Sequence, residues 1–201
     1  MSIGIFGGTF DPIHDGHIRV AQSTRETMGL DEVRLIPANI PPHRNAPDVA
    51  PEHRLAMVQA ATKDYEGLLC DDREMNFLGP SFTMRTLESL CREFPQERLF
   101  LILGLDAFLG LPTWYRWRDI PDLTKIIIVN RPGVALPEPL PDWWQWLENG
   151  HSSQSAVELV NMAPYDVSAT ELRLRLKARQ SVEGLLHPDV ITYIQENGLY
   201  V

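Results

Sequence analysis

The sequence has few cysteines and no long apolar run, and both absences exclude whole classes of protein. Cys70 and Cys91 are the only cysteines among 201 residues, and they form no Cys-x-x-Cys pair. Two isolated thiols do not make the disulfide framework of a small secreted domain. No apolar run approaches the ~20 residues of a membrane span, and the N-terminus lacks the features of a signal peptide. We expect a cytoplasmic protein with reduced thiols and no membrane partner.

An excess of positive charge is also absent. Asp and Glu outnumber Lys and Arg by 27 to 18, which gives a formal net charge of -9 at pH 7. Such a chain does not generally attract nucleic acid, and we expect none as a partner. An anionic substrate therefore requires a local cluster of basic side chains and backbone amides.

Length and composition fit one domain. With 201 residues, 44% of them hydrophobic, the chain can bury one sizeable core, whereas two domains would both be undersized. We expect a single domain over 1–201, with a helical C-terminal part at about 168–201. No segment repeats at a fixed period, which argues against a solenoid.

Apolar segments alternate with helical patterns along the chain. Segments with strand character lie at 3–6, 33–36, 68–70, 99–103 and 125–129. The last two are almost continuously apolar, as expected for strands covered on both faces. Helical patterns lie at 17–28, ended by Gly29, from Pro51 onward, and at 81–94. This alternation predicts an α/β fold with a doubly wound, mainly parallel sheet and helices on both faces. Ligands of such folds bind beyond the carboxyl ends of the strands.

The segment 133–155 shows no such pattern. Prolines are frequent in and beside it, and it contains Trp143, Trp144 and Trp146. We predict irregular structure there. The sequence leaves open whether the tryptophans cover the core or contact another subunit of a homo-oligomer.

The most informative segment is 7–17, which reads GGTFDPIHDGH and follows the first apolar segment. Gly7 and Gly8 allow positive φ angles and a close approach to a ligand, and the helix expected from His17 presents unpaired N–H groups and the positive end of its dipole. This arrangement predicts a phosphate site. The chain lacks both Gly-x-Gly-x-x-Gly and the Gly-Lys-Ser/Thr of a Walker loop, so two common phosphate motifs are excluded.

In this segment, His14 and His17 take the place of the missing lysine. A cation at a helix N-terminus is unfavourable because it opposes the helix dipole, and a bound anion would compensate this cost. The alternative without a ligand is a plain loop histidine followed by a plain helix residue. Two histidines can also chelate a metal, but only Asp11 and Asp15 lie nearby, so we expect no metal ligands in the protein itself.

Further segments, in this order, support one family resemblance: IPANIPPHR at 36–44, PSFT at 80–83, GLD at 104–106, PTWY at 112–115, NRPG at 130–133 and VSATELR at 167–173. With the His-x-Gly-His motif at 14–17, the chain resembles the nicotinate mononucleotide adenylyltransferases of the nucleotidyltransferase superfamily over its whole length. The resemblance implies a Rossmann-like nucleotidyltransferase fold. It also implies adenylyl transfer from ATP to nicotinate mononucleotide, giving nicotinate adenine dinucleotide and pyrophosphate in NAD biosynthesis.

The resemblance also implies roles for matching residues. The catalytic residues would be His14, His17 and Arg173. The ATP contacts would be Gly7, Gly8, Thr9, Phe10, Gly104, Asp106, Ser168 and Thr170. The mononucleotide contacts would be Asn39, Thr83, Trp114, Tyr115 and Arg131. Apart from the resemblance, His43 and Arg44 are basic residues that follow Pro41-Pro42, and we expect them in a further loop that faces phosphate.

Without the resemblance, several of these residues have plainer interpretations. Ser168 to Glu171 form a capping box, in which the serine hydroxyl accepts from the N–H of Glu171 and the glutamate reaches back. Asp106 fits an N-cap, and Trp114 and Tyr115 fit core or cover residues.

Basic residues are similarly ambiguous. Arg173 and Arg175 near a helix start oppose its dipole unless an anion binds. His43 and Arg44 form either a phosphate loop or a solvated turn, and Arg131 either binds phosphate or caps a helix. Histidines expected to be structural are His53, His151 and His187.

The expected reaction needs no protein nucleophile. The second pKa of a phosphate monoester is ~6, so the attacking oxygen is largely ionised at neutral pH. The requirement is to bring two anions together and stabilise the leaving pyrophosphate. We expect Mg²⁺ to arrive with ATP, held mainly by phosphates and water. Two alternatives stay open: transfer to another phosphate, such as phosphopantetheine or glycerol phosphate, and a catalytically silent nucleotide sensor.

Overall fold

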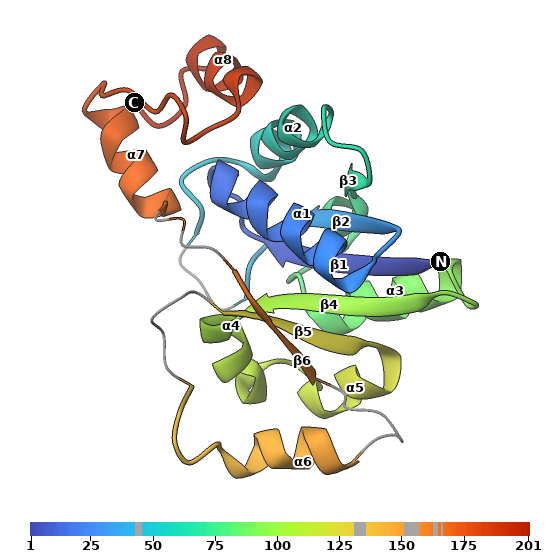
Figure 1. Ribbon diagram of the computed structural model, residues 1–201. Helices are drawn as coiled ribbons and strands as arrows, with labels where there is room; N and C mark the ends of the chain where they lie inside the picture. Colours follow the sequence, from blue (N-terminus) through green and yellow to red (C-terminus); the bar gives the residue numbers. More distant parts are fainter. Residues whose placement is uncertain (43–45, 131–135, 151–156, 163–164, 166) are drawn as a thin grey trace.

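The computed structural model describes residues 1–42, 46–130, 136–150, 157–162, 165 and 167–201. Six strands in this part form one sheet in the order β3-β2-β1-β4-β5-β6, and every neighbouring pair is parallel (Figure 1). The strands are β1 Ser2–Gly8, β2 Glu32–Pro37, β3 Leu68–Cys70, β4 Arg98–Gly104, β5 Lys125–Asn130 and β6 Val157–Asn161. The predicted doubly wound parallel sheet is therefore confirmed.

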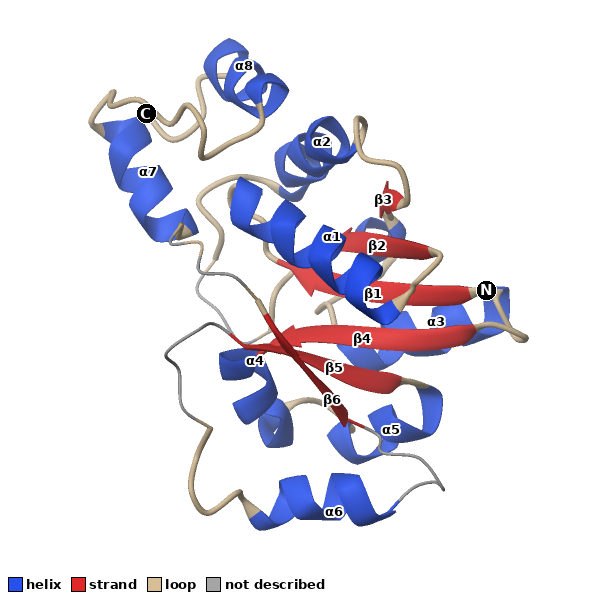
Figure 2. Cartoon of the chain, in the orientation of Figure 1, coloured by secondary structure: helices blue, strands red, loops and turns tan. Residues whose placement is uncertain are grey.

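Helices cover both faces of this sheet (Figure 2). The α-helices are α1 Asp15–Met28, α2 Pro51–Thr62, α3 Thr83–Glu93, α4 Leu105–Leu109, α5 Ile120–Leu123, α6 Asp142–Gly150, α7 Ala169–Lys177 and α8 Pro188–Glu196. Short 3-10 helices span Arg73–Asn76, Leu111–Thr113 and Trp117–Asp119. No helix among the described residues is long and apolar enough to cross a membrane.

Successive side chains of the strands fill two separate cores. In β4, Leu101 and Leu103 pack on one face with α3, α4, α5 and α6, whereas Phe100 and Ile102 pack on the other with α1, α2 and α8. Alternate side chains of a strand point to opposite faces, so a strand buried on both sides is apolar throughout. This is why the sequence of β4 and β5 is almost continuously apolar.

Local signals predicted several helix ends correctly. Pro51 is the first residue of α2, and Gly29 ends α1 with a φ of 60°. Glycine adopts this left-handed conformation without strain, and proline at the first helical position loses no hydrogen bond.

The prediction of irregular structure at 133–155 is wrong for 142–150, which form α6. Aromatic residues are mediocre helix formers, so the local sequence carries no helical signal, and tertiary packing stabilises this helix. Trp144 is buried against Phe108, and Trp143 contacts Phe108 and Trp117. The covering role of these tryptophans is confirmed. The edge strand β6 was also missed, because its short segment is largely exposed.

The chain order places a topological switch point between β1 and β4. From β1 the chain leads outward through β2 to β3, and β4 then lies on the opposite side of β1. The loops that follow two such strands diverge to opposite faces and leave a crevice at the carboxyl end of the sheet. Gly8 ends β1 and Gly104 ends β4, so both glycines border this crevice.

Candidate active site

A cavity of about 690 Å³ opens at this end of the sheet. Among the residues that line it are most of the predicted site residues: Gly7, Gly8, Thr9, Phe10, His17, Thr83, Gly104, Asp106, Trp114, Tyr115, Thr170 and Arg173. They come from β1, α1, α3, α4, α7 and the loops between them. Segments distant in sequence thus meet around one volume, which is large enough for a nucleotide-sized ligand.

The backbone after β1 forms one wall of the cavity. Gly7 and Gly8 belong to the extended strand, so the prediction that they adopt positive φ is wrong. The left-handed residue is Phe10, with a φ of 49°. Gly8 is needed for a different reason, since a Cβ there would lie 2.8 Å from the Phe10 ring. The loop therefore depends on close packing between its own residues.

His17 lies at the cavity, and His14 lies behind it. Helix α1 begins at Asp15 rather than at His17, and His14 is its N-cap. The two imidazole rings stack with centroids 3.7 Å apart, and the backbone N–H of His14 donates to Nδ1 of His17 over 3.2 Å. With Nδ1 as an acceptor, a neutral His17 carries its proton on Nε2. His17 is thus set as a hydrogen-bond donor at Nε2.

Helix α7 brings Thr170 and Arg173 to the cavity. Ser168 is its N-cap and accepts from the N–H of Glu171 over 3.2 Å, as predicted. The second half of the predicted capping box is wrong, because the Glu171 carboxylate accepts from Arg175 instead, at 2.6 Å. Exposed ion pairs at this spacing stabilise helices, and this one explains Arg175 without an anion.

Arg173 is held toward the cavity by the loop after β1. Its Nη1 donates to the backbone oxygen of Asp11 over 2.8 Å, and its Nε lies 3.5 Å from a carboxylate oxygen of Asp48. The side chain is mostly buried, with 23% exposed. A guanidinium has five donors, so these contacts leave others for an anion.

The opposite wall follows β4. Gly104, not Asp106, is the N-cap of α4, so the N-cap interpretation of Asp106 is wrong; Asp106 lies in the first turn. Further along, Tyr115 is half exposed and packs against Phe82, with the rings tilted by 33° and their centroids 4.9 Å apart. Thr83 begins α3 beside them, and Trp114 is partly buried. This end of the cavity combines aromatic rings with a helix N-terminus.

Three predicted contacts do not line the cavity: His14, Asn39 and Ser168. The backbone N–H of Asn39 donates to the Ser81 hydroxyl over 2.9 Å. Three more predicted residues, His43, Arg44 and Arg131, lie outside the described residues, as does His151.

Sequence reasoning missed Arg54, which is fully buried next to the cavity. Its two terminal nitrogens donate to the backbone oxygens of Thr9 and Asn39, over 2.7 and 2.9 Å. Burial lowers the pKa of this guanidinium, and the nearby Asp11 carboxylate opposes that change. A signal existed: Arg54 precedes the buried Met57 by three residues and therefore lies on the buried face of α2.

Glu74 was missed as well. It is buried, lines the cavity and accepts a hydrogen bond from the Thr86 hydroxyl over 2.5 Å. Burial raises the pKa of its carboxyl group. No local pattern in the sequence indicates that a carboxylate of this short 3-10 helix enters the site.

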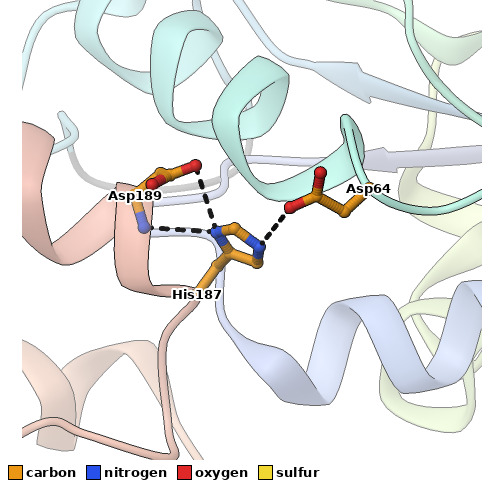
Figure 3. Close-up of side chains that lie close together, drawn as sticks. All are labelled: Asp64, His187 and Asp189. Atoms are coloured by element: carbon orange, nitrogen blue, oxygen red, sulfur yellow. Dashed lines mark hydrogen bonds and ion pairs between the residues drawn. The ribbon is translucent and has the colours of Figure 1, made fainter.

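Figure 3 shows another cluster, at the C-terminal end of α2, formed by Asp64, His187 and Asp189. The ligand atoms of these three residues lie within 4.8 Å of one another, as in a metal site. However, Nδ1 of His187 accepts the backbone N–H of Asp189 and caps α8, Nε2 lies 3.2 Å from Asp64, and Lys63 pairs with Asp189. These bonds give the cluster a structural role, as predicted for His187.

Comparisons with known proteins identify relatives along the whole chain. The Cytidylyltransferase-like family matches residues 5–175. A protein of Aeromonas hydrophila described as "Probable nicotinate-nucleotide adenylyltransferase" is 41% identical, covering 98% of this chain and 96% of its own. One of Halorhodospira halophila with the same description is 42% identical, covering 99% and 95%.

Solved structures show the same fold at low sequence identity. The nicotinic acid mononucleotide adenylyltransferase of Plasmodium falciparum, complexed with NaAD, is 19% identical and superimposes with a TM-score of 0.77. That match covers 99% of this chain and 97% of the other. The same protein complexed with APC gives a TM-score of 0.75.

Proposed function

The chain belongs to the nicotinate-nucleotide adenylyltransferases, a branch of the cytidylyltransferase-like family, and from this premise we propose that it transfers the adenylyl group of ATP to nicotinate mononucleotide. The products are nicotinate adenine dinucleotide and pyrophosphate, and the reaction is a step of NAD biosynthesis. The observation that carries the proposal is one cavity that combines His17 and Arg173 with an aromatic end at Trp114 and Tyr115.

ATP fits the part of the cavity around the ends of β1 and β4. Its triphosphate would lie against the loop after β1 and the start of α7, where Thr170 and Arg173 face the cavity. Backbone amides and helix N-termini favour anions, and this location provides both. Asp106, on the other wall, can accept hydrogen bonds from ribose hydroxyls.

In the transfer step, a phosphate oxygen of the mononucleotide attacks the α-phosphorus in line, and the bond to the pyrophosphate oxygen breaks. No covalent enzyme intermediate forms, and no general base is needed at neutral pH. Nε2–H of His17 and the guanidinium of Arg173 donate to oxygens whose charge increases in the transition state. Fixed donors of this kind stabilise a transition state more than a ground state.

The carboxylates of the cavity suit Mg²⁺ bound to ATP rather than to the protein. Both carboxylate oxygens of Asp11 already accept hydrogen bonds, and Glu74 is bonded to Thr86. Among the described lining residues this leaves the carboxylate of Asp106, which would accept from the ribose, so Mg²⁺ would be held mainly by phosphates and water. When bound, Mg²⁺ neutralises phosphate charge and fixes the triphosphate geometry.

The aromatic end suits the pyridine ring of the mononucleotide. Trp114 offers a surface for stacking, and the N–H groups at the start of α3, near Thr83, suit a carboxylate. An amide at the same place would present its own NH₂ to those donors. This difference favours nicotinate over nicotinamide mononucleotide.

A panel of phosphate acceptors tests the proposal. The purified protein is incubated with ATP, Mg²⁺ and either nicotinate mononucleotide, phosphopantetheine or glycerol phosphate, and pyrophosphate and the nucleotide product are both identified. We expect nicotinate adenine dinucleotide from the first acceptor alone. Product from another acceptor would overturn the proposed substrate, and no pyrophosphate with any acceptor would favour a nucleotide sensor.

A further inference from the structure

The second-to-last residue of the chain contacts the motif at its beginning. The hydroxyl of Tyr200 donates to Oδ1 of Asp11 over 2.7 Å, in a buried position and across 189 residues of sequence. We propose that Tyr200 is a positioning residue of the transfer reaction, which acts through Asp11 to fix the loop after β1 and Arg173. This inference rests on the function proposed above.

Asp11 connects three parts of the chain. Its carboxylate accepts from Tyr200 at one oxygen and from the backbone N–H of Asp48 at the other, over 2.8 Å. Its backbone oxygen accepts from Nη1 of Arg173, over 2.8 Å. The carboxylate thus fixes the peptide group that orients the catalytic guanidinium. A shift of Asp11 would move Arg173 directly.

The other side of the same loop is fixed by Arg54. This buried guanidinium donates to the backbone oxygen of Thr9, two residues before Asp11, and its charge is close to the carboxylate of Asp11. Loop residues 9–11 are therefore held between Arg54 and Tyr200. Because Phe10 between them has a strained positive φ, its conformation must be imposed by such surrounding contacts.

The backbone of the C-terminal segment places Tyr200 beside Asp11. After α8 the chain turns at Gly198, with a φ of 57°, and the N–H of Leu199 donates to the oxygen of Ile194. Tyr200 itself has a φ of 60° and is 5% exposed. Burial and the neighbouring Asp11 raise the pKa of its hydroxyl, so it remains a donor at neutral pH. A left-handed backbone conformation is unusual for tyrosine and indicates a specific contact.

Tyr200→Phe removes only the hydroxyl, and Tyr193→Phe is a matched control. Tyr193 lies on α8, and its hydroxyl bonds Nδ1 of His53 over 2.9 Å, away from the cavity. Steady-state kinetics with ATP and nicotinate mononucleotide, together with thermal unfolding, are measured for both variants. We expect Tyr200→Phe to lower kcat by about 10-fold or more with little change in the KM of ATP, because small displacements of catalytic groups reduce rates strongly. Tyr193→Phe should leave kcat within about twofold of wild type, because Tyr193 is partly buried on α8 and does not line the cavity.

Asp11→Asn provides the second variant. Asparagine keeps the size of the side chain but has one acceptor oxygen instead of two, so it too should lower kcat. In the double variant, Tyr200→Phe should add less than about twofold to the Asp11→Asn loss, since groups that act through one another are not additive. Unchanged kcat in folded Tyr200→Phe, or losses that multiply in the double variant, would overturn the proposal. If Tyr200→Phe does not fold, unchanged kcat in Asp11→Asn would overturn it.

A readout without turnover separates this inference from the proposed function. In protein labelled with ¹⁵N-histidine, Tyr200→Phe should shift the ring signals of His17, because the His17 ring lies against Phe10 of the same loop, with centroids 5.0 Å apart. Tyr193→Phe should instead shift the ring signals of His53, which bonds the Tyr193 hydroxyl. If wild-type protein makes no product from nicotinate mononucleotide, the proposed function fails, and the His17 signals still decide the role of Tyr200. Unchanged His17 signals in Tyr200→Phe would contradict that role.

Discussion

Replacing His17 by alanine removes a donor and a structural contact at once. The imidazole lines the cavity, and its Nδ1 accepts the N–H of His14 over 3.2 Å. The ring also meets Phe10 edge to face, with centroids 5.0 Å apart. His17→Ala should therefore lower both the rate of adenylyl transfer and the stability of the fold, by amounts that can be separated.

The size of each effect follows from these contacts. Loss of one preorganised donor to a developing charge reduces kcat by about 10²–10³-fold. Loss of the hydrogen bond removes about 1 kcal/mol of stability, and loss of the aromatic contact a further ~0.5–1.5 kcal/mol. A decrease of about 2 kcal/mol lowers the Tm of a chain of this length by roughly 4–8 °C. The variant should remain folded at room temperature.

The assay is pyrophosphate release under saturating substrates, with ATP affinity measured separately. ATP binding should change little, because the donor is most effective in the transition state. His53→Ala is the control, since it also removes a ring with a hydrogen bond and an aromatic contact, outside the cavity. Turnover of His17→Ala equal to that of His53→Ala would refute the catalytic role.

Three further predictions follow from individual side chains. Burial raises the pKa of Asp71, but bonds from Arg73 and Arg34 outweigh it and hold the pKa below its ordinary value. The stabilisation that these bonds give the folded state is present above about pH 4 and is lost as the pH falls through the lowered pKa of Asp71. Asp71→Asn should therefore reduce the free energy of unfolding at pH 7 by about 3 kcal/mol. Acid titration of the stability of wild type and variant checks the difference. Burial raises the pKa of Cys70 to about 12; its alkylation at pH 8 should be at least ~10²-fold slower in the folded than in the urea-unfolded protein, and equal rates would contradict the burial. Trp114→Ala should weaken both the acid and the amide mononucleotide in kcat/KM by a similar factor, whereas a selective loss of the acid would show that the indole itself discriminates.

The fold was predictable because its signals are local. Continuous apolar strands such as β4 and β5, together with Gly29 and Pro51 at helix ends, indicate a doubly wound sheet without any tertiary information. Helix α6 and the edge strand β6 were not predictable in this way. Helix α6 forms because Trp144 packs on Phe108, and no periodic pattern in the sequence predicts that contact.

The candidate site was predictable where its residues form motifs. The segment containing His14 and His17 and the one containing Arg173 are recognisable in the sequence, and the fold brings both to one end of the sheet. The contacts that position these segments are distant in sequence: the Tyr200 hydroxyl bonds Asp11 across 189 residues. The left-handed backbone at Phe10 likewise depends on packing that no propensity encodes.

The preference between the acid and the amide mononucleotide decides whether this site is built for nicotinate. Wild-type protein is assayed with ATP and Mg²⁺ and with nicotinate or nicotinamide mononucleotide, and kcat/KM is determined for each. We expect the acid to be preferred by about 10²-fold or more, because the donors near Thr83 are satisfied by a carboxylate and opposed by an amide NH₂. Equal efficiencies for the acid and the amide would contradict it.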